Sequence, residues 1–275
     1  MTKKSVTSLG KSASQRSVQS DSQAYLDKKH FFKQLLTLYG RKTALEALQH
    51  PSVKVFRLHL SESNKPAPIL DELVERAKQQ GAEICVHDKK ALSRISKNSK
   101  QDQGVAIDLY LPGFMECEDF LNNKHEHEHG MRVVAVDGVT NPQNLGMIVR
   151  SVCASGHSIL LLPRSGCANI DALVIKASAG SLFRAGIVRC DTLSQGLTAF
   201  KQQGYMLAGL DAKASCSLSD YRQNKPTVYI LGNETEGLSK STIQSCDTLL
   251  SIPLYNGVES LNVAVTAALV AFKVH

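Results

Sequence analysis

Side chains that could bind a ligand or move a proton gather in three segments of the C-terminal half. The first, VAVDGVTNPQNLGMIVRS, holds Asn144 and Arg150. Asn141 and Pro142 are typical of a helix N-cap and its first helical residue, so Asn144 and Arg150 are expected on one helix. At 100° per residue they face different sides, and they reach one site only if the first turn is irregular. The alternative is that Asn144 is a turn residue and Arg150 a solvated arginine.

The second segment is YILGNETEGLS, in which an apolar strand pattern runs through Leu231 into Gly232. Glycine at the carboxyl end of a strand lets backbone approach a ligand closely, and a side chain there would fill the ligand's space. Glu234 adds a carboxylate. The alternative is a plain strand-to-helix turn with a capping acid.

The third segment is SIPLYNGVESLNVAVTAAL, in which a strand pattern is followed by an Asn-Gly turn. Ser260 is expected to cap the helix that follows, and Asn262 to lie just inside that apolar helix. An unpaired amide there would cost about 1–3 kcal/mol, so Asn262 needs a partner in the protein or a ligand.

Three common site motifs are missing from the sequence. It contains no GxGxxG after a strand pattern, no GxxxxGK[ST] and no GxSxG. These absences argue against a dinucleotide fold, a Gly-rich Rossmann-type methyltransferase, a P-loop enzyme and an α/β hydrolase.

Residues 131–275, which contain all three segments, are expected to form an α/β domain. Several of its apolar runs are continuous rather than alternating, which is typical of a parallel sheet covered on both faces. A final apolar helix over 260–270 is expected to be buried. The predicted strands are 133–136, 158–162, 185–188, 205–210, 228–231 and 249–252, and two further helices are 171–179 and 193–203.

Residues 31–112 are expected to form a separate small α/β domain. Periodicity predicts helices over 42–48 and 69–80, the second ended by Gly81, and strands over 53–60, 83–86 and 104–109. The run KKALSRISKNSK, residues 89–100, has basic residues and no acids, and either faces phosphate or is simply solvated.

Two segments are expected to lie outside the domains. Residues 1–30 are rich in Ser, Gln and Lys with no apolar signal-peptide core, which predicts a disordered basic tail. Residues 113–130 are interpreted as a linker. It contains HEHEHG, whose alternate histidines could share one face of a strand, but a polar linker is favoured and no metal site is predicted.

Composition indicates the kind of partner and the cell compartment rather than the activity. The net charge of +7 tilts the interpretation towards a polyanionic partner, with a solvated basic surface as the alternative. Seven scattered cysteines, none in a CxxC pair, favour a reducing cytoplasm over a secreted disulfide framework. No apolar run approaches the roughly 18–20 residues that span a bilayer, so no membrane association is expected.

Taken together and in this order, the three segments resemble motifs 1, 2 and 3 of the SpoU/TrmH family of RNA ribose 2′-O-methyltransferases. The resemblance covers about residue 131 to 275 and rests on NPQNLGMIVR, LGNETEG and IPLYNGVESLNV. KASAGSLFRAGIVR is similar to the middle stretch of the family. YGRKTALEAL and QGVAI resemble its L30e-like substrate-binding domain, except that Asp102 stands where the family usually has histidine. In the third motif, Ala264 and Thr266 replace the commoner Ser and Ala.

The resemblance implies a C-terminal domain with a deep trefoil knot, S-adenosylmethionine as methyl donor, and a homodimer whose active sites are completed across the interface. It implies that Arg150 accepts the proton of the ribose hydroxyl or binds phosphate. The supporting residues that it implies are Asn144, Glu234, Ser260 and Asn262, and the cofactor pocket that it implies is formed by Leu231, Gly232, Ile252, Leu254 and Leu261.

The substrate that the resemblance implies is structured RNA. A folded N-terminal module favours ribosomal RNA over transfer RNA, which remains the alternative. A second alternative is a non-catalytic RNA-binding homologue. Retention of Asn144, Arg150, Glu234, Ser260 and Asn262 together weighs against such a decayed enzyme.

Overall fold

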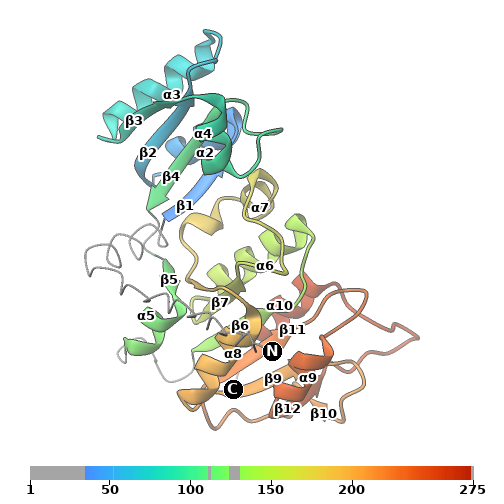
Figure 1. The fold of residues 1–275 in the computed structure, drawn as a ribbon. Helices are drawn as coiled ribbons and strands as arrows, with labels where there is room; N and C mark the ends of the chain where they lie inside the picture. Colours follow the sequence, from blue (N-terminus) through green and yellow to red (C-terminus); the bar gives the residue numbers. More distant parts are fainter. Residues whose placement is uncertain (1–34, 52, 111–112, 124–130, 274–275) are drawn as a thin grey trace, which may run out of the picture. The chain divides into compact units, whose positions relative to one another are not determined.

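The computed structural model describes residues 35–51, 53–110, 113–123 and 131–273. The expected tail over 1–30 and the histidines of HEHEHG lie outside these residues. Two sheets organise the described chain, one within residues 35–110 and one within 114–251 (Figure 1). None of the helices in the described part is long and apolar enough to cross a bilayer.

The N-terminal domain is a four-stranded sheet with the order β1-β4-β2-β3. Only β2 and β3 run parallel, while β4 pairs antiparallel with both of its neighbours. Gly81, with a φ of 70°, follows the end of α3 as the sequence predicts. The elements are β1 (Leu35–Tyr39), α2 (Arg41–Gln49), β2 (Lys54–Ser61), α3 (Pro68–Gln79), β3 (Glu83–His87), α4 (Lys89–Ser96) and β4 (Val105–Tyr110).

The C-terminal domain is an eight-stranded sheet with the order β10-β12-β9-β11-β6-β7-β8-β5, in which all neighbouring strands are parallel. The predicted parallel α/β domain is therefore confirmed. Its strands are β5 (Phe114–Glu116), β6 (Arg132–Val136), β7 (Ser158–Pro163), β8 (Ile187–Cys190), β9 (Met206–Leu210), β10 (Cys216–Ser217), β11 (Thr227–Leu231) and β12 (Thr248–Ser251). Its helices are α5 (Cys117–Asn122), α6 (Pro142–Ser155), α7 (Ala172–Ala177), the short 3-10 helix Ser181–Phe183, α8 (Leu193–Gln202), α9 (Lys240–Ser245) and α10 (Val263–Ala271).

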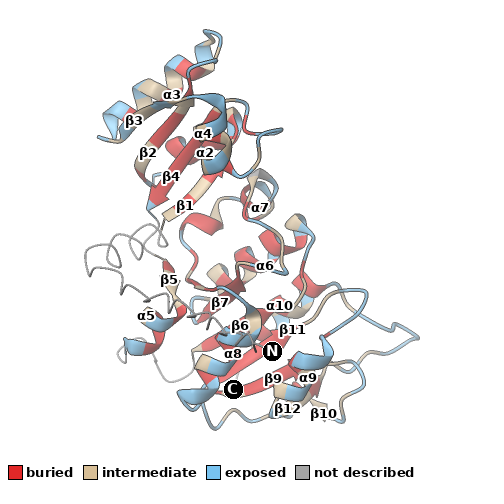
Figure 2. Ribbon diagram, viewed as in Figure 1, coloured by how far each residue is buried: buried red, intermediate tan, exposed pale blue. Residues whose placement is uncertain are grey.

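Both faces of this sheet are covered, which explains its continuous apolar strands. Val134 and Val136 of β6 pack in one buried cluster with residues of α6, α7 and α10. Val133 and Ala135, which point the other way, pack with residues of α5 and α8. Figure 2 shows the central strands buried between helices whose outer surfaces are exposed. The central strands thus present mainly apolar side chains to both faces, and the strand ends remain for chemistry.

The expected linker over 113–130 is wrong for residues 114–122. Phe114 begins β5, which pairs in parallel with β8 at the edge of the large sheet. Phe120 and Leu121 on α5 are buried against the same sheet. This segment is part of the C-terminal domain because its few apolar side chains gain burial there, although its acidic residues and glycine are typical of a loop.

The last helix is only half buried, in contrast to the expectation. It spans Val263–Ala271, and Val263, Ala267 and Val270 face the core. Val265 and Leu269 are 49% and 45% exposed, and Phe272 just beyond the helix is 53% exposed. These three side chains follow a spacing of four and three residues, so they form one exposed apolar stripe.

Candidate functional site

A pocket of about 400 Å³ opens at the carboxyl edge of the C-terminal sheet. This size lies in the range of roughly 300–1,000 Å³ that is common for small-molecule sites. The residues that line it lie at the carboxyl ends of strands β9, β11 and β12, in the loops that follow these strands, on α9, and within or just before α10. They are Leu210–Lys213, Leu231–Leu238, Ile243, Leu250, Ile252, Leu254, Ser260, Leu261, Val263 and Thr266.

The pocket brings together most of the residues expected at a cofactor site. The expected cofactor residues that line it are Leu231, Gly232, Ile252, Leu254 and Leu261. Glu234 and Ser260, expected in supporting roles, line it as well. Asn144, Asn262 and Arg150 do not line it, so their places must be described separately.

Asn144 and Asn262 connect to the pocket through a chain of hydrogen bonds. Asn144, which is 7% exposed, donates from Nδ2 to the Glu234 carboxylate. Its Oδ1 accepts a hydrogen bond of 3.1 Å from Nδ2 of Asn262. The three side chains come from α6, the loop after β11 and the start of α10. The network therefore fixes the Glu234 carboxylate at the pocket wall.

The start of α10 differs from the expectation. Asn262 lies outside the helix as its N-cap, and its Oδ1 accepts a hydrogen bond of 2.8 Å from the backbone N–H of Ala264. Ser260 is exposed and precedes the helix by three residues. The expectation that Asn262 needs a partner is confirmed, and its partners are Asn144 and the helix terminus. Both Ser and Asn are good N-cap residues, so the sequence alone could not choose between Ser260 and Asn262.

The physical reason for glycine at position 232 also differs from the expectation. A Cβ built on Gly232 would lie 2.2 Å from the backbone carbon of Gly237 and 2.4 Å from the nitrogen of Leu238. A side chain would therefore collide with the backbone of the next loop before it filled the pocket. Gly232 permits a close approach of two backbone segments, and this approach shapes the pocket.

Two residues that hold this loop were missed in the sequence. Oδ1 of Asn233 accepts hydrogen bonds from the backbone N–H groups of Thr235 and Glu236, at 2.8 and 3.3 Å. Its Nδ2 donates to the carbonyl of Gly138 at 2.8 Å. Asp137 accepts a 2.8 Å hydrogen bond from the N–H of Ser239. Their only signal was a place directly after a strand, which is where loop-holding polar residues occur.

Arg150 lies apart from the pocket of its own chain. α6 begins at Pro142 after the N-cap Asn141, as predicted, and continues without interruption to Ser155. The irregular first turn that could bring Arg150 beside Asn144 is absent. Arg150 is exposed and makes no hydrogen bond or ion pair with any residue that the structure describes.

The N-terminal domain has a hollow of its own, of about 690 Å³. Its lining includes Arg41, Lys65, Lys89 and Lys100. The Arg41 side chain is held in place by Nε donating to the carbonyl of Gln103 at 3.1 Å. The arrangement concentrates positive charge around a concave surface, which suits a phosphate-bearing ligand.

Asp102 has a structural role in this domain. It is 8% exposed. Its carboxylate accepts hydrogen bonds from the Ser96 hydroxyl at 2.9 Å and from the N–H of Gly104 at 3.0 Å. The residue that departs from the family pattern thus ties the end of α4 to the turn before β4.

Comparison with known proteins agrees with this architecture. A model of the SpoU rRNA methylase family matches residues 131–272. A model of the substrate-binding domain of RNA 2′-O ribose methyltransferases matches residues 37–110. A protein of Mycobacterium leprae named as an uncharacterized tRNA/rRNA methyltransferase is 33% identical over 239 residues, which cover 86% of this chain and 76% of that protein.

Solved structures with the same fold belong to the same group. An AdoMet-bound rRNA methyltransferase from Sinorhizobium meliloti aligns with a TM-score of 0.59 at 22% identity, over 90% of this chain and 89% of that one. The SpoU methyltransferase AviRb from Streptomyces viridochromogenes, in complex with AdoMet, aligns with a TM-score of 0.56 at 24% identity, over 89% and 91%. This chain therefore belongs to the SpoU rRNA methylase family and is an RNA methyltransferase.

Proposed function

We propose that this protein transfers a methyl group from S-adenosylmethionine to the 2′-hydroxyl of a ribose in ribosomal RNA. The observation that carries the proposal is the pocket at the carboxyl edge of the sheet, lined by Leu231, Gly232, Ile252, Leu254 and Leu261 with Glu234 fixed at its wall. The substrate-binding model that matches residues 37–110 supports ribose methylation.

The pocket fits the chemical groups of this cofactor. Ile252, Leu254 and Leu261 offer apolar surface for an adenine ring. Asp211 and Glu234 offer negative charge for a sulfonium and an amino group, and Lys213 offers positive charge for a carboxylate. S-adenosylmethionine would supply a methyl group on a positively charged sulfur, so no metal ion is needed to activate the donor.

The protein must position the ribose oxygen and deal with its proton. A guanidinium is almost always protonated, so Arg150 serves best by binding the phosphate beside the target ribose and holding the hydroxyl in line. Asn144 and Asn262 keep the Glu234 carboxylate in place, where it can accept a hydrogen bond from the substrate or the cofactor. Ser260 offers a hydroxyl at the same wall.

We infer that the active enzyme is a homodimer, because Arg150 does not line the pocket of its own chain. Val265, Leu269 and Phe272 form an exposed apolar stripe on α10, and Met147 on the neighbouring α6 is also exposed. Burying such a stripe against a second copy is favourable. A dimer formed there would let Arg150 act on the pocket of the other copy.

A deep trefoil knot remains part of the proposal. The segments around Gly232–Leu238 and 252–261 line the same pocket although α9 and β12 separate them in sequence, which is compatible with a threaded C-terminal segment. An experimental map that traces residues 233–262 of one chain without a break would test the knot.

The N-terminal domain is proposed to supply affinity for RNA. Arg41, Lys65, Lys89 and Lys100 around its hollow are suited to phosphate groups. The family description and the folded substrate-binding domain favour ribosomal RNA. A transfer RNA substrate is the second candidate, because the Mycobacterium leprae relative is named for both. We place the enzyme in the cytoplasm as part of this proposal.

One experiment separates these substrates. Total RNA from a strain that lacks the gene is mapped for 2′-O-methylation and compared with the parent strain. Purified protein is then supplied with S-adenosylmethionine and either ribosomal or transfer RNA from that strain. A single ribosomal site that is lost in the strain and restored in vitro is expected. Loss at a transfer RNA site would replace ribosomal RNA by the second candidate.

Calorimetry with S-adenosylmethionine tests whether the chain is an active member of its family. Saturable binding at one site per chain is expected. Binding of RNA without binding of the cofactor would identify a non-catalytic RNA-binding homologue and would overturn the proposed activity.

A further inference from the structure

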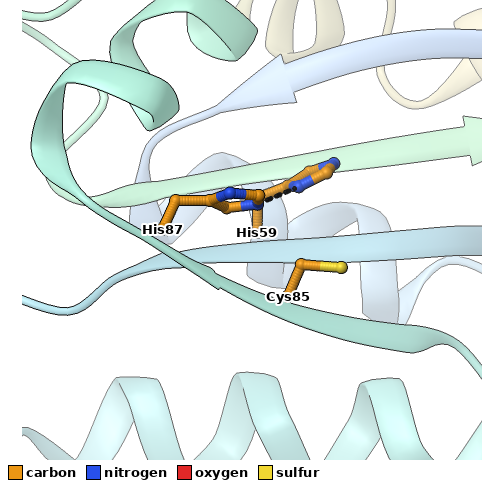
Figure 3. Close-up of side chains that lie close together, drawn as sticks. All are labelled: His59, Cys85 and His87. Carbon is orange, nitrogen blue, oxygen red and sulfur yellow. Dashed lines mark hydrogen bonds between the residues drawn. The ribbon is translucent and has the colours of Figure 1, made fainter.

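A polar row crosses one face of the N-terminal sheet, far from the pocket in sequence. Strand pairing places His59 on β2 directly beside Cys85 on β3, and His87 lies two residues further along β3. Residues two apart on a strand share a face, so these three side chains project together. Figure 3 shows the two imidazole rings joined by a hydrogen bond, with the Cys85 thiol close by.

His59 is held in one orientation by two partners. It is 3% exposed, and its Nε2 lies 2.9 Å from Oδ2 of Asp108 on β4. The other oxygen of that carboxylate accepts a 2.7 Å hydrogen bond from the Thr37 hydroxyl on β1. The remaining ring nitrogen, Nδ1, lies 2.9 Å from Nε2 of His87.

We propose that His59, Cys85 and His87 bind a Zn²⁺ ion. Their potential ligand atoms all lie within 4.8 Å of one another. Imidazole nitrogen and thiolate sulfur are ligands that zinc prefers, and three protein ligands leave a fourth position for water. Asp108 takes the place of the outer carboxylate that commonly orients a metal-bound histidine and fixes its tautomer.

Small side-chain movements complete the geometry. Ideal tetrahedral bonds separate two nitrogen ligands by roughly 3.3 Å and a nitrogen from a sulfur by roughly 3.6 Å. The imidazoles must therefore move apart slightly, and Cys85 must turn towards them. The Cys85 thiol now donates to Oε1 of Glu83 at 3.3 Å, an exposed interaction that is easily exchanged.

Proton positions favour the exchange of a hydrogen bond for a metal. With the Nε2 proton of His59 directed to Asp108, Nδ1 of His59 accepts and Nε2 of His87 donates. On binding, the His87 proton moves to its Nδ1 and the Cys85 thiol releases its proton to solvent, one proton in all.

A bound ion would cross-link β2 to the edge strand β3. An edge strand has a neighbour on one side only, so a metal bond across this pair would stabilise the domain that is proposed to bind RNA. No local pattern in the sequence indicates the site, because His59 is 26 and 28 residues away from Cys85 and His87 and meets them only through strand pairing.

The test uses the full chain with His125, His127 and His129 replaced by alanine, which removes a competing metal-binding run that lies outside the described residues. After treatment with a chelator, the protein is titrated with Co²⁺ and with Zn²⁺. One equivalent of Co²⁺ should produce the charge-transfer absorption of a cobalt–thiolate bond, and Zn²⁺ should abolish it and raise the melting temperature. Mg²⁺, which prefers oxygen ligands, should do neither.

Variants assign the signal to these residues. Cys85→Ser and His87→Ala should lose it, whereas Cys216→Ser, which changes another partly buried cysteine, should keep it. Asp108→Asn should weaken Zn²⁺ binding by roughly 10–100-fold. Retention of the cobalt–thiolate band in Cys85→Ser would show an adventitious site elsewhere and would overturn the proposal.

A measurement without these substitutions guards against unfolded variants. Zn²⁺ should slow the alkylation of Cys85, followed by mass spectrometry of the native sequence, and leave Cys216 unchanged. Equal alkylation of Cys85 with and without Zn²⁺ would mean that the row is a hydrogen-bonded network only.

Discussion

The two sheets of this protein place their polar side chains in opposite ways. In the all-parallel C-terminal sheet, both faces are apolar and covered, and the site residues gather at the carboxyl edge. In the mixed N-terminal sheet, His59 and Asp108 lie buried in the middle of one face. The comparison indicates that a sheet covered on both faces restricts chemistry to its edge, whereas a sheet with one polar face can hold a site between its strands.

The substitution with the largest expected effect is Arg150→Ala. If methyl transfer depends on the edge pocket and on Arg150 from a second copy, activity should fall by roughly 10²-fold or more, because the ribose hydroxyl is no longer held in line. The melting temperature and cofactor affinity should stay close to those of the unchanged protein, because Arg150 is exposed and has no partner among the described residues. Single-turnover methylation of a responsive RNA measures the loss, with Arg222→Ala as the control.

Mixing two inactive variants makes the same test sharper. Arg150→Ala and Glu234→Gln chains are each expected to be inactive alone. In a mixed dimer, the Arg150→Ala chain keeps an intact Glu234 and receives Arg150 from the other chain, so partial activity should return. An Arg150→Ala protein within a few-fold of normal activity, or mixtures that stay inactive, would contradict the shared site.

Replacing Gly232 tests whether its close backbone contact shapes the pocket at the edge of the C-terminal sheet. Gly232→Ala should destabilise the protein by roughly 1–3 kcal/mol through the collision with Gly237 and Leu238, and cofactor affinity should fall with it. Gly81→Ala is the matched control in the other sheet, since Gly81 has a positive φ and open space around it. It should lower stability without changing affinity. Thermal melts measure the stability and calorimetry measures the cofactor affinity of both variants. A Gly232→Ala protein of normal stability would disprove the backbone collision.

Asn262 both caps α10 and bonds to Asn144. Two variants separate the effect of the cap on stability from the effect of the hydrogen bond on activity. Asn262→Ala should lose about 1 kcal/mol because it removes the N-cap of α10. Asn262→Ser should keep the cap but lose the hydrogen bond to Asn144, so stability should be nearly normal while methylation is reduced. Denaturant unfolding and single-turnover rates measure the two effects. Equal activity of the serine variant and the unchanged protein would exclude a positioning role for the hydrogen bond between Asn144 and Asn262.

The smallest effect concerns the N-terminal domain. Changing Lys65, Lys89 and Lys100 to glutamine should weaken RNA binding and reduce its salt dependence. For each RNA phosphate that is no longer neutralised, the slope of log affinity against log salt should fall by roughly 0.7. Substitution of the exposed residues Lys90 and Arg94 on α4 and Lys97 directly after it tests whether the RNA-binding surface extends beyond the hollow. Cofactor affinity should not change in either variant, and an unchanged slope in both would remove this domain from RNA binding.

The sequence predicted the C-terminal fold well because its strands are continuous apolar runs with clear ends. The N-cap Asn141 and the first helical residue Pro142 were also predicted, since both signals are local. The expected pocket residues that follow β11 and β12 could be placed because the carboxyl ends of parallel strands meet at one edge of a sheet.

Features that depend on distant partners could not be predicted. β5 is only three residues long, and only its pairing with β8 makes it a strand. The N-cap of α10 is Asn262 rather than Ser260, and its side chain also bonds Asn144, which is 118 residues away in sequence. His59 and Asp108 meet only because β2 and β4 are neighbours in the N-terminal sheet, and the local sequence pattern does not predict this strand order.

The residues that line the pocket are synthesised in the order of the sequence, so the pocket is completed late. Its walls are contributed by residues from Leu210 to Thr266, and Leu261, Val263 and Thr266 are the last of them to be made. The lining of the basic hollow ends at Gly104, and β4, the last strand of its sheet, ends at Tyr110. A growing chain therefore completes its proposed RNA-binding surface well before it can hold a methyl donor. A product terminated before Ile252 would lack a wall of the pocket, so it could occupy RNA without modifying it.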